Sequence, residues 1–379
     1  MADSSGKAIE ELMKRPGNEI CADCSTKDPE WASYNLGIFI CARCSAIHRG
    51  LGAHISKVKH VKMDRWEASQ LERMREVGNS AAKMKYESRV PSCYRRPVEG
   101  DPQPLLEEWI CAKYLREEFN RLERPSFMSG SLEGFLMKRG KEDARFHPRK
   151  FVLAGDTISY YVKEQNREPK AVVKLAELNV AFIPKKTGHP NSLQLTWVRG
   201  DGSTRHIFVY HDDPQTIVHW YMAIRCAKLH RLQVAYPSAQ EDELVGLLTQ
   251  DFIKEGWLFK TGPRPTDAYK KRWFTLDNRK LMYHEDPLDA HPKGEVFLGH
   301  MLEGYSVRVG VAAGFKDQGF SFLLSTPERR YNLSALTAPD RDHWISVIQD
   351  VLQRPLTLQE KTMSKGLVRK RGMFNNNRR

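Results

Sequence analysis

The stretch CADCSTKDPEWASYNLGIFICARC, residues 21–44, carries four cysteines as two C-x2-C pairs separated by 16 residues. Each pair makes a tight turn that brings two thiolates to one metal ion, and two such turns complete a tetrahedral site. The spacing therefore predicts that Cys21, Cys24, Cys41 and Cys44 bind one structural Zn²⁺. Because sulfur fills every ligand position, this metal is expected to shape the fold and not to act on a substrate.

Working outward from the cysteines, the apolar run at residues 38–40 predicts a short strand inside the loop between the two pairs. Farther along the chain, apolar residues recur at helical spacing: Leu105, Leu106, Trp109, Ile110 and Tyr114. The cysteine pairs thus open a mainly helical domain that reaches to about residue 128.

Arg49 lies five positions after Cys44. The stretch from Cys21 to Trp66 resembles the Arf GTPase-activating domain, whose signature is C-x2-C-x16-C-x2-C-x4-R. The resemblance implies that Arg49 is a catalytic finger, supplied in trans to a GTPase, and that the zinc only shapes the domain. Such an activator has no substrate turnover of its own. Trp31 and Ile38 are expected to support the surface on which the GTPase docks.

The sequence after residue 130 repeats itself. EGFLMKRG (133–140) matches EGWLFKTG (255–262), and RKFVL (149–153) matches RWFTL (272–276). The matched pairs run from Lys138 with Lys260 to Trp220 with Trp344, and the two members of each pair are 122 to 124 residues apart. Such a constant offset indicates a duplicated domain. Each copy reads as several alternating strands followed by one helix, and Trp220 and Trp344 on these helices are predicted to fill the cores.

Each copy resembles a pleckstrin homology (PH) domain, a helix-capped antiparallel barrel or sandwich. The resemblance implies phosphoinositide binding through basic and tyrosine side chains: Lys138, Arg149, Tyr161 and Lys170 in the first copy, and Lys260, Lys270, Arg272, Tyr283 and Lys293 in the second. It favours lipids phosphorylated at the inositol 3-position and the corresponding soluble inositol tetrakisphosphate. His147 replaces a basic residue of the pattern in the first copy.

The formal net charge of +13 suggests an anionic partner. The last 25 residues carry seven basic and one acidic side chain, whereas residues 1–131 carry 21 basic and 19 acidic ones. A zinc protein that binds nucleic acid needs a basic extension after its cysteine pairs. The nearly neutral N-terminal domain lacks one, so nucleic acid is not an expected partner.

The remaining cysteines, Cys93, Cys111 and Cys226, are interpreted as small buried hydrophobic residues. The cysteine pairs, an N-terminus without a signal peptide and the lack of long apolar runs favour a cytoplasmic protein. Recruitment to the plasma membrane is then expected to be peripheral.

The predicted fold is therefore multidomain α+β: an Arf-GAP zinc-finger domain (1–130), a PH domain (131–233), a linker (234–252) with a short helix, a second PH domain (253–357) and a basic disordered tail (358–379). The whole chain resembles the Arf-GAPs with dual PH domains, or centaurin alpha family. The expected function is GTPase activation on Arf proteins at phosphoinositide-containing membranes. The alternative is a non-catalytic adaptor that binds its partners through the zinc domain.

Overall fold

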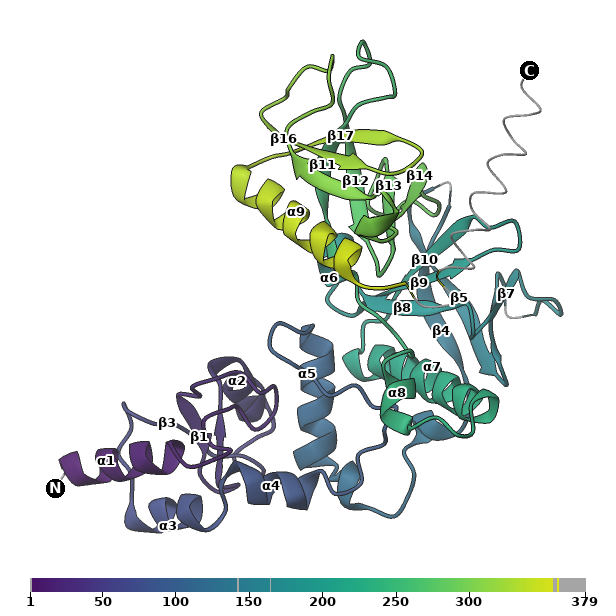
Figure 1. Ribbon diagram of the computed structural model, residues 1–379. Helices are drawn as coiled ribbons and strands as arrows, with labels where there is room; N and C mark the ends of the chain where they lie inside the picture. The colour runs from purple at the N-terminus through teal and green to yellow at the C-terminus, as the bar shows by residue number, and fades with distance from the viewer. Residues whose placement is uncertain (1, 142, 164, 357–359, 361–379) are drawn as a thin grey trace. The chain divides into compact units, whose positions relative to one another are not determined.

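The computed structural model describes residues 2–141, 143–163, 165–356 and 360 (Figure 1). The N-terminal domain is mainly helical around a small sheet. Its elements are α1 (Ala2–Met13), β1 (Trp31–Ser33), β2 (Ile38–Ile40), α2 (Ala42–Gly50), β3 (Val58–His60), α3 (Ala68–Glu76), α4 (Gly78–Tyr86), α5 (Gln103–Ile110), a π-helical turn (Cys111–Leu115) and two 3-10 turns (Glu118–Asn120 and Ser126–Met128).

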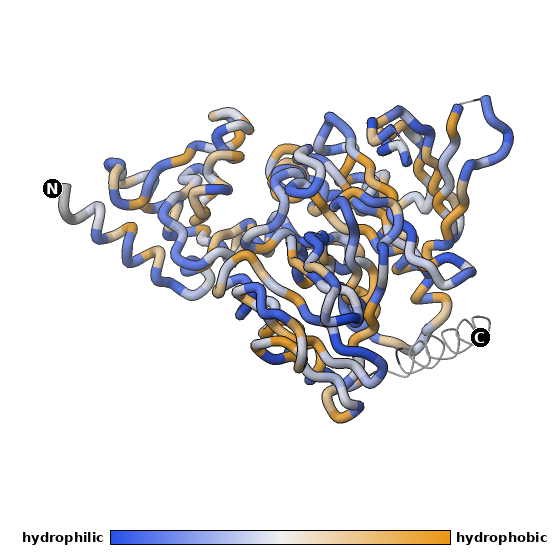
Figure 2. Tube along the Cα trace, turned by 90° about the horizontal axis from the view of Figure 1, so that it is seen from above, coloured by the Kyte–Doolittle hydropathy of each residue, from blue (hydrophilic) through white to orange (hydrophobic). Residues whose placement is uncertain are grey.

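The core of the N-terminal domain forms where apolar residues of separate elements meet. Along α1, hydrophobic and hydrophilic positions alternate (Figure 2), and its Ile9 and Leu12 pack with Phe39 and Trp66. The predicted strand at 38–40 is confirmed as β2, which pairs with the central strand β1. The predicted helical stripe is confirmed too, because its residues are buried along α5 and the π-helical turn.

The first repeat folds into an antiparallel sheet that is followed by one long helix. Its described strands run in the order β7-β6-β5-β4-β10-β9-β8. Their bounds are β4 (Ser131–Arg139), β5 (Phe146–Ala154), β6 (Thr157–Tyr161), β7 (Ala171–Lys174), β8 (Asn179–Phe182), β9 (Ser192–Val198) and β10 (Thr204–Tyr210), with helices α6 (Pro184–Thr187) and α7 (Pro214–Ala235). Asp213 caps α7 by accepting hydrogen bonds from the backbone N–H groups of Gln215 and Thr216. Trp220 is 2% exposed, so its predicted core position is confirmed.

The second repeat has the same strand order, β14-β13-β12-β11-β17-β16-β15, which confirms the duplication. Its elements are β11 (Lys254–Lys260), β12 (Lys270–Leu276), β13 (Lys280–His284), β14 (Gly294–Phe297), a 3-10 turn (Met301–Glu303), β15 (Ser306–Val309), β16 (Phe320–Ser325), β17 (Arg330–Ala335) and α9 (Ala338–Gln353). Helix α9 lies across the sheet (Figure 1). Its Trp344 is fully buried in the core, as predicted.

The chain divides into two compact units. One unit joins the N-terminal domain to most of the first repeat (residues 1–195 and 207–249), and the other contains the second repeat. The predicted linker helix is present as α8 (Glu241–Val245). Within the described residues, no helix is both long and apolar enough to cross a membrane. The predicted basic tail lies outside the described residues, apart from residue 360.

One sequence-based prediction about the cysteines is wrong. Cys93 and Cys226 are joined by a disulfide and are not independent buried thiols. Cys93 precedes α5 in the N-terminal domain, and Cys226 lies on α7 of the first repeat. Because 133 residues separate them, the chain gave no local signal that they meet. Tertiary packing within the first unit, including the contact of α5 with α7, brings them together.

Candidate metal centre, arginine and anion pockets

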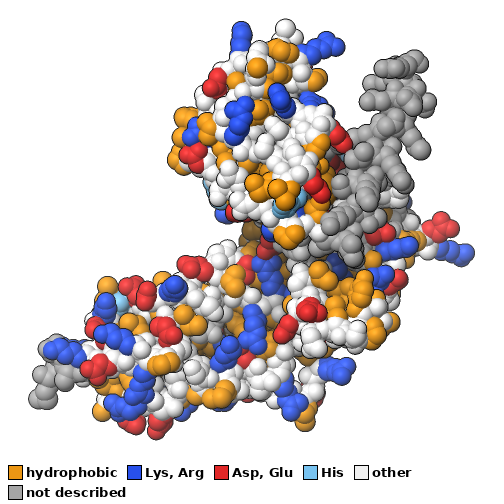
Figure 3. Space-filling model, in the orientation of Figure 1, with side chains coloured by type: hydrophobic (Ala, Val, Ile, Leu, Met, Phe, Trp, Pro, Cys, Tyr) orange, Lys and Arg blue, Asp and Glu red, His pale blue; other side chains and the backbone are white. Residues whose placement is uncertain are grey.

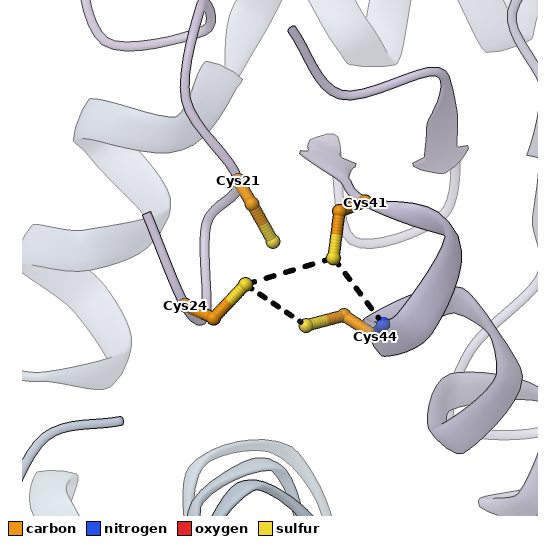
Figure 4. A group of neighbouring side chains, drawn as sticks. All are labelled: Cys21, Cys24, Cys41 and Cys44. Atoms are coloured by element: carbon orange, nitrogen blue, oxygen red, sulfur yellow. Dashed lines mark hydrogen bonds between the residues drawn. The ribbon is translucent and has the colours of Figure 1, made fainter. Parts of the chain in front are cut away.

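The four cysteines of the two pairs meet at one point. Their sulfur atoms all lie within 4.8 Å of one another, and the side chains converge from a loop and from the start of α2 (Figure 4). Cys24 Sγ lies 3.6 Å from the sulfur atoms of both Cys41 and Cys44. A tetrahedral zinc with Zn–S bonds of about 2.3 Å places its sulfur ligands about 3.8 Å apart. The cluster therefore has the donors and spacing of a closed zinc site.

A buried polar network supports the metal centre from behind. Asp23, inside the first cysteine pair, accepts hydrogen bonds from His48 Nε2 (3.0 Å), Lys113 Nζ (3.2 Å) and Tyr114 OH (3.0 Å). His48 Nδ1 bonds to Ser56 Oγ at 2.9 Å. Burial raises the pKa of Asp23, but the Lys113 charge and the His48 hydrogen bond outweigh it, so the pKa is lowered overall. The network ties the first cysteine turn to α2 and to the π-helical turn.

Arg49 lies beside His48 in the last turn of α2, and its side chain is exposed. Its guanidinium carbon lies 4.3 Å from the centre of the Trp31 ring, a stacked cation–π contact. The helix that carries Arg49 begins at Ala42, and the sulfur of the preceding Cys41 caps it by accepting from the Cys44 N–H. One end of this helix therefore belongs to the metal cluster, and the other presents a held but accessible cation.

Ile38 is a core residue of the N-terminal domain. It is fully buried in β2, because the flanking α4 packs on this strand. Its side chain can therefore support a docking surface only from within the core, and its supporting role stays a prediction. Trp31 is only half-buried and remains accessible.

The second repeat gathers all five of its predicted anion-binding residues around one cavity of about 550 Å³. These residues are Lys260, Lys270, Arg272, Tyr283 and Lys293. Lys260 Nζ lies 5.0 Å from the centre of the Tyr283 ring. Burial, together with the charges of Arg329 and Arg272, lowers the pKa of Lys260 to about 8. A bound polyanion would stabilise the charged forms of these crowded cations.

Two residues that sequence reasoning missed place charges beside the side chains that line this cavity. Arg329, in the turn before β17, adds positive charge near Lys260. Glu285 forms salt bridges with Lys293 (2.6 Å) and Arg272 (3.9 Å), and the hydrogen bond from Lys293 lowers the pKa of Glu285. Neither belongs to the repeated basic pattern, so the sequence offered no signal for them.

The first repeat has a matching arrangement, but with a different tyrosine. Lys138 Nζ lies 5.0 Å from the centre of the Tyr160 ring, and Tyr160 pairs with Phe151 as Tyr283 pairs with Phe274. The Lys170 N–H donates to the Tyr160 carbonyl oxygen at 2.8 Å, and Lys293 does the same to Tyr283. The predicted match of Tyr161 with Tyr283 is therefore wrong by one position, since Tyr161 corresponds to His284.

His147 takes the place of Lys270 in the first repeat, because it lies opposite Lys138 as Lys270 lies opposite Lys260. Its Nε2 contacts the Asp143 carboxylate, and this hydrogen bond lowers the pKa of Asp143. Arg149 occupies the same position as Arg272, and both side chains bond to the preceding carbonyl oxygen. Within the repeated basic pattern, the two sets of side chains thus differ by one lysine.

Known families and proteins match these domains in the same order. The family model described as "Putative GTPase activating protein for Arf" matches residues 6–123. The PH domain model matches residues 131–228 and 252–353. The chain is 43% identical over 359 residues to Arf-GAP with dual PH domain-containing protein 2 of mouse, covering 93% of this chain and 94% of that protein.

The chain belongs to the family of Arf-GAPs with dual PH domains. The human protein of the same description is also 43% identical over 359 residues, covering 93% of this chain and 94% of that protein. Human stromal membrane-associated protein 1 is 42% identical over 111 residues, which are 29% of this chain and 23% of that protein.

Membership of this family confirms the predicted fold, an Arf-GAP domain followed by two PH domains. It places the chain among Arf GTPase-activating proteins with PH domains, and the cysteine cluster is compatible with zinc.

On the face of the Arf-GAP domain that Figure 3 shows, Lys and Arg side chains are interspersed with Asp and Glu. This mixed surface agrees with the nearly balanced charge counted along residues 1–131.

Proposed function

We propose that the chain accelerates GTP hydrolysis by membrane-bound Arf proteins, with Arg49 as the arginine finger and the PH domains as phosphoinositide receptors. The observation that carries this proposal is the mounting of Arg49. It is exposed at the end of α2, it stacks on Trp31 at 4.3 Å, and its helix starts at a cysteine of the metal cluster.

The chemistry explains why the support matters. During GTP hydrolysis, negative charge spreads over the transferring phosphoryl group, and a guanidinium inserted in trans stabilises it. An error of about 1 Å in the position of such a group forfeits much of the effect. We infer that one structural Zn²⁺, held by Cys21, Cys24, Cys41 and Cys44, fixes the start of α2. The Asp23–His48 hydrogen bond then fixes the end of α2 beside Arg49.

The PH domain pockets are proposed to bind inositol phosphates through charge-assisted hydrogen bonds, with lysines as point donors and arginines as planar forks. In the second PH domain, the ligand phosphates would displace Glu285 from Lys293 and Arg272. In the first, the set becomes Lys138, Arg149, Tyr160 and Lys170, with Tyr160 in place of Tyr161. Phosphatidylinositol 3,4,5-trisphosphate and soluble inositol tetrakisphosphate are the proposed ligands.

Binding at the second PH domain is expected to weaken as the pH rises above about 8. The pKa of Lys260 is lowered to about 8 in the free protein, and a bound phosphate would raise it, so binding takes up a proton above that pH. Linkage then allows a loss of up to about tenfold in affinity per pH unit. Calorimetry with inositol tetrakisphosphate from pH 7 to 10, on full-length Arg149→Ala protein, measures this loss at the second pocket.

The control for this titration is Lys260→Arg, which keeps its charge throughout the range. The pH dependence above 8 should largely disappear in that variant, and equal pH profiles for both proteins would contradict the prediction.

The free energy of unfolding should change in the opposite direction to the affinity, rising with pH above 8. The pKa of Lys260 is lower in the folded chain than the usual value of about 10.4, so the cost of burying the charged amine disappears as the pH rises from 8 to 10.

Replacing His147 by lysine is expected to raise the affinity of the first PH domain for inositol tetrakisphosphate about tenfold. The change adds a charge-assisted hydrogen bond, worth about 1.5–3 kcal/mol, and the lower end applies to this half-exposed site. Calorimetry on the full-length Arg272→Ala protein reports the first pocket alone. His147→Gln is the matched control, because it releases Asp143 without adding charge. An equal gain from both substitutions would refute the assignment of His147 to the pocket.

Membrane recruitment would confine the search for Arf to a surface and raise its effective concentration without changing the chemical step. We propose a cytoplasmic protein that is recruited peripherally to the plasma membrane. The alternative function is a lipid-directed adaptor that binds Arf without catalysis. Because the Arf-GAP domain and most of the first PH domain form one compact unit, lipid binding would bring both domains to the membrane together.

Single-turnover GTP hydrolysis by liposome-bound Arf separates these two functions. The full-length protein is expected to accelerate hydrolysis, and phosphatidylinositol 3,4,5-trisphosphate should enhance the acceleration. An Arg272→Ala and Arg149→Ala double variant should lose the enhancement by lipid but keep the activity at high protein concentration. Lipid binding without any acceleration of hydrolysis would favour the adaptor.

A further inference from the structure

The disulfide between Cys93 and Cys226 joins two different domains. Cys93 belongs to the Arf-GAP domain and Cys226 to α7 of the first PH domain. Their Cα atoms are 5.0 Å apart, within the range of about 4.4–6.8 Å that a disulfide requires. The backbones therefore need no movement for the bond to form or break.

Contacts that do not involve sulfur hold the same two segments together. Arg225 Nε donates to the Cys93 carbonyl oxygen at 2.7 Å, and Arg95 Nη1 donates to Tyr221 OH at 3.1 Å. A few residues away, His219 Nε2 lies 3.2 Å from a Glu108 carboxylate oxygen. Because these contacts are independent of the bond, the two thiols would stay adjacent in the reduced protein, at a high effective concentration.

A cavity of about 940 Å³ reaches both cysteines. Cys226 is half-buried, whereas Cys93 is 2% exposed, so a reagent in the cavity meets Cys226 first. The lining includes the basic Arg124 and Arg231 and the acidic Asp156 and Glu241. This volume and mixed charge suit a small peptide disulfide such as oxidised glutathione, which carries both carboxylates and ammonium groups.

We propose that Cys93 and Cys226 are a reversible thiol–disulfide modification site that covalently joins the Arf-GAP domain to the first PH domain, with glutathione disulfide as the oxidant. In a reducing compartment the pair would be mostly dithiol, and the link would form as the glutathione pool becomes oxidised. The site requires neither Arf nor lipid, so its test is separate from that of the proposed function.

The chemical step exchanges one disulfide for another. The Cys226 thiolate attacks a sulfur of glutathione disulfide, forming a mixed disulfide and releasing one glutathione thiolate. The Cys93 thiol then loses its proton and attacks the Cys226 sulfur, which releases the second glutathione. Two cysteine thiols are thereby oxidised and one glutathione disulfide is reduced to two glutathiones. Excess glutathione reverses both steps.

The test equilibrates the full-length, zinc-loaded protein in buffers of increasing oxidised-to-reduced glutathione ratio, followed by acid trapping, alkylation and peptide mass spectrometry. Cys93 and Cys226 are expected to lose alkylation together and to appear as one cross-linked peptide pair. Cys111, a half-buried free cysteine of the same domain, is the internal control and should stay alkylated. A metal-sensitive dye monitors the zinc, which should remain bound.

The two single variants identify the attacked sulfur. Cys93→Ser should trap Cys226 as a stable mixed disulfide with glutathione, whereas Cys226→Ser should leave Cys93 alkylated over the same range. In the wild-type protein, the linked form should unfold at a temperature roughly 5 °C or more above the reduced form. Independent glutathionylation of the two cysteines, or oxidation of the zinc cysteines before this pair, would overturn the proposal. Both outcomes are read from the wild-type chain, even if a variant fails to fold.

Discussion

Replacing Arg49 by lysine is expected to slow Arf GTP hydrolysis by about 10³–10⁵-fold relative to the wild-type activator, which corresponds to ~4–7 kcal/mol of transition-state stabilisation. Lysine keeps the positive charge, but it lacks the planar fork that contacts two phosphoryl oxygens at once. It also loses the stacking of the guanidinium on Trp31, which lies 4.3 Å away. Single-turnover hydrolysis on liposomes at saturating activator measures the chemical step without the contribution of binding.

The matched control for this variant is Arg43→Lys on the same helix. Arg43 lies in the first turn of α2, and its Nε donates to the Gln103 side chain at 3.1 Å. The change removes a comparable guanidinium from the same helix and should leave the rate within about twofold of wild type, as expected for a surface substitution. Equal losses in both variants would show that the reduction comes from damage to α2 and not from loss of a finger.

Removing the metal is expected to unfold the Arf-GAP domain. A structural zinc site of four cysteines contributes about 10–16 kcal/mol of apparent binding energy, which becomes folding energy because the unfolded chain has no preformed site. Chelation, or Cys44→Ala, should therefore release one zinc per chain and abolish GTPase activation. Zinc content by mass spectrometry and helical content by circular dichroism provide the measurements.

The second PH domain offers an internal control for zinc removal, because it belongs to the other compact unit. Its affinity for inositol tetrakisphosphate should survive chelation. Cys111→Ala should keep both zinc and activity, since Cys111 is outside the cluster. A chain that retains its helical signal and its activity after complete loss of metal would contradict a structural role for zinc.

The domains were predictable because their signals are periodic or local. The cysteine spacing predicted the cluster, since two tight turns with two thiols each leave few other arrangements. The helices that carry Trp220 and Trp344 were predictable from apolar spacing, and both side chains fill cores as expected. The duplication was visible in matched residues and reappears as identical strand orders.

The tyrosine of the first pocket was misassigned because two adjacent tyrosines fit the repeat. A constant offset of 123 residues joins Arg149 to Arg272 and Lys170 to Lys293, and it also joins Tyr160 to Tyr283. The prediction took Tyr161 at an offset of 122. On a strand, a shift of one residue moves the side chain to the opposite face. The register of β5 with β6 therefore decides between the two residues.

Other parts of the site depend on contacts between distant segments, and sequence alone could not supply them. Lys113 reaches Asp23 across 90 residues, and its ammonium group is almost fully buried. Arg329 adds positive charge near Lys260 from a turn with no counterpart in the repeated pattern. Such polar contacts follow from tertiary packing, because a buried charge must find a partner wherever the fold provides one.

The most direct test of the arginine finger is the affinity of the full-length protein for Arf in three nucleotide states: GDP, a non-hydrolysable GTP analogue, and GDP with aluminium fluoride, which mimics the transferring phosphoryl group. Catalysis requires tighter binding to the transition state than to the ground state. We expect the aluminium fluoride complex to be the tightest, and Arg49→Lys to lose that preference while it still binds the GTP-analogue form. Equal binding of wild-type and Arg49→Lys protein to the aluminium fluoride complex would contradict the account.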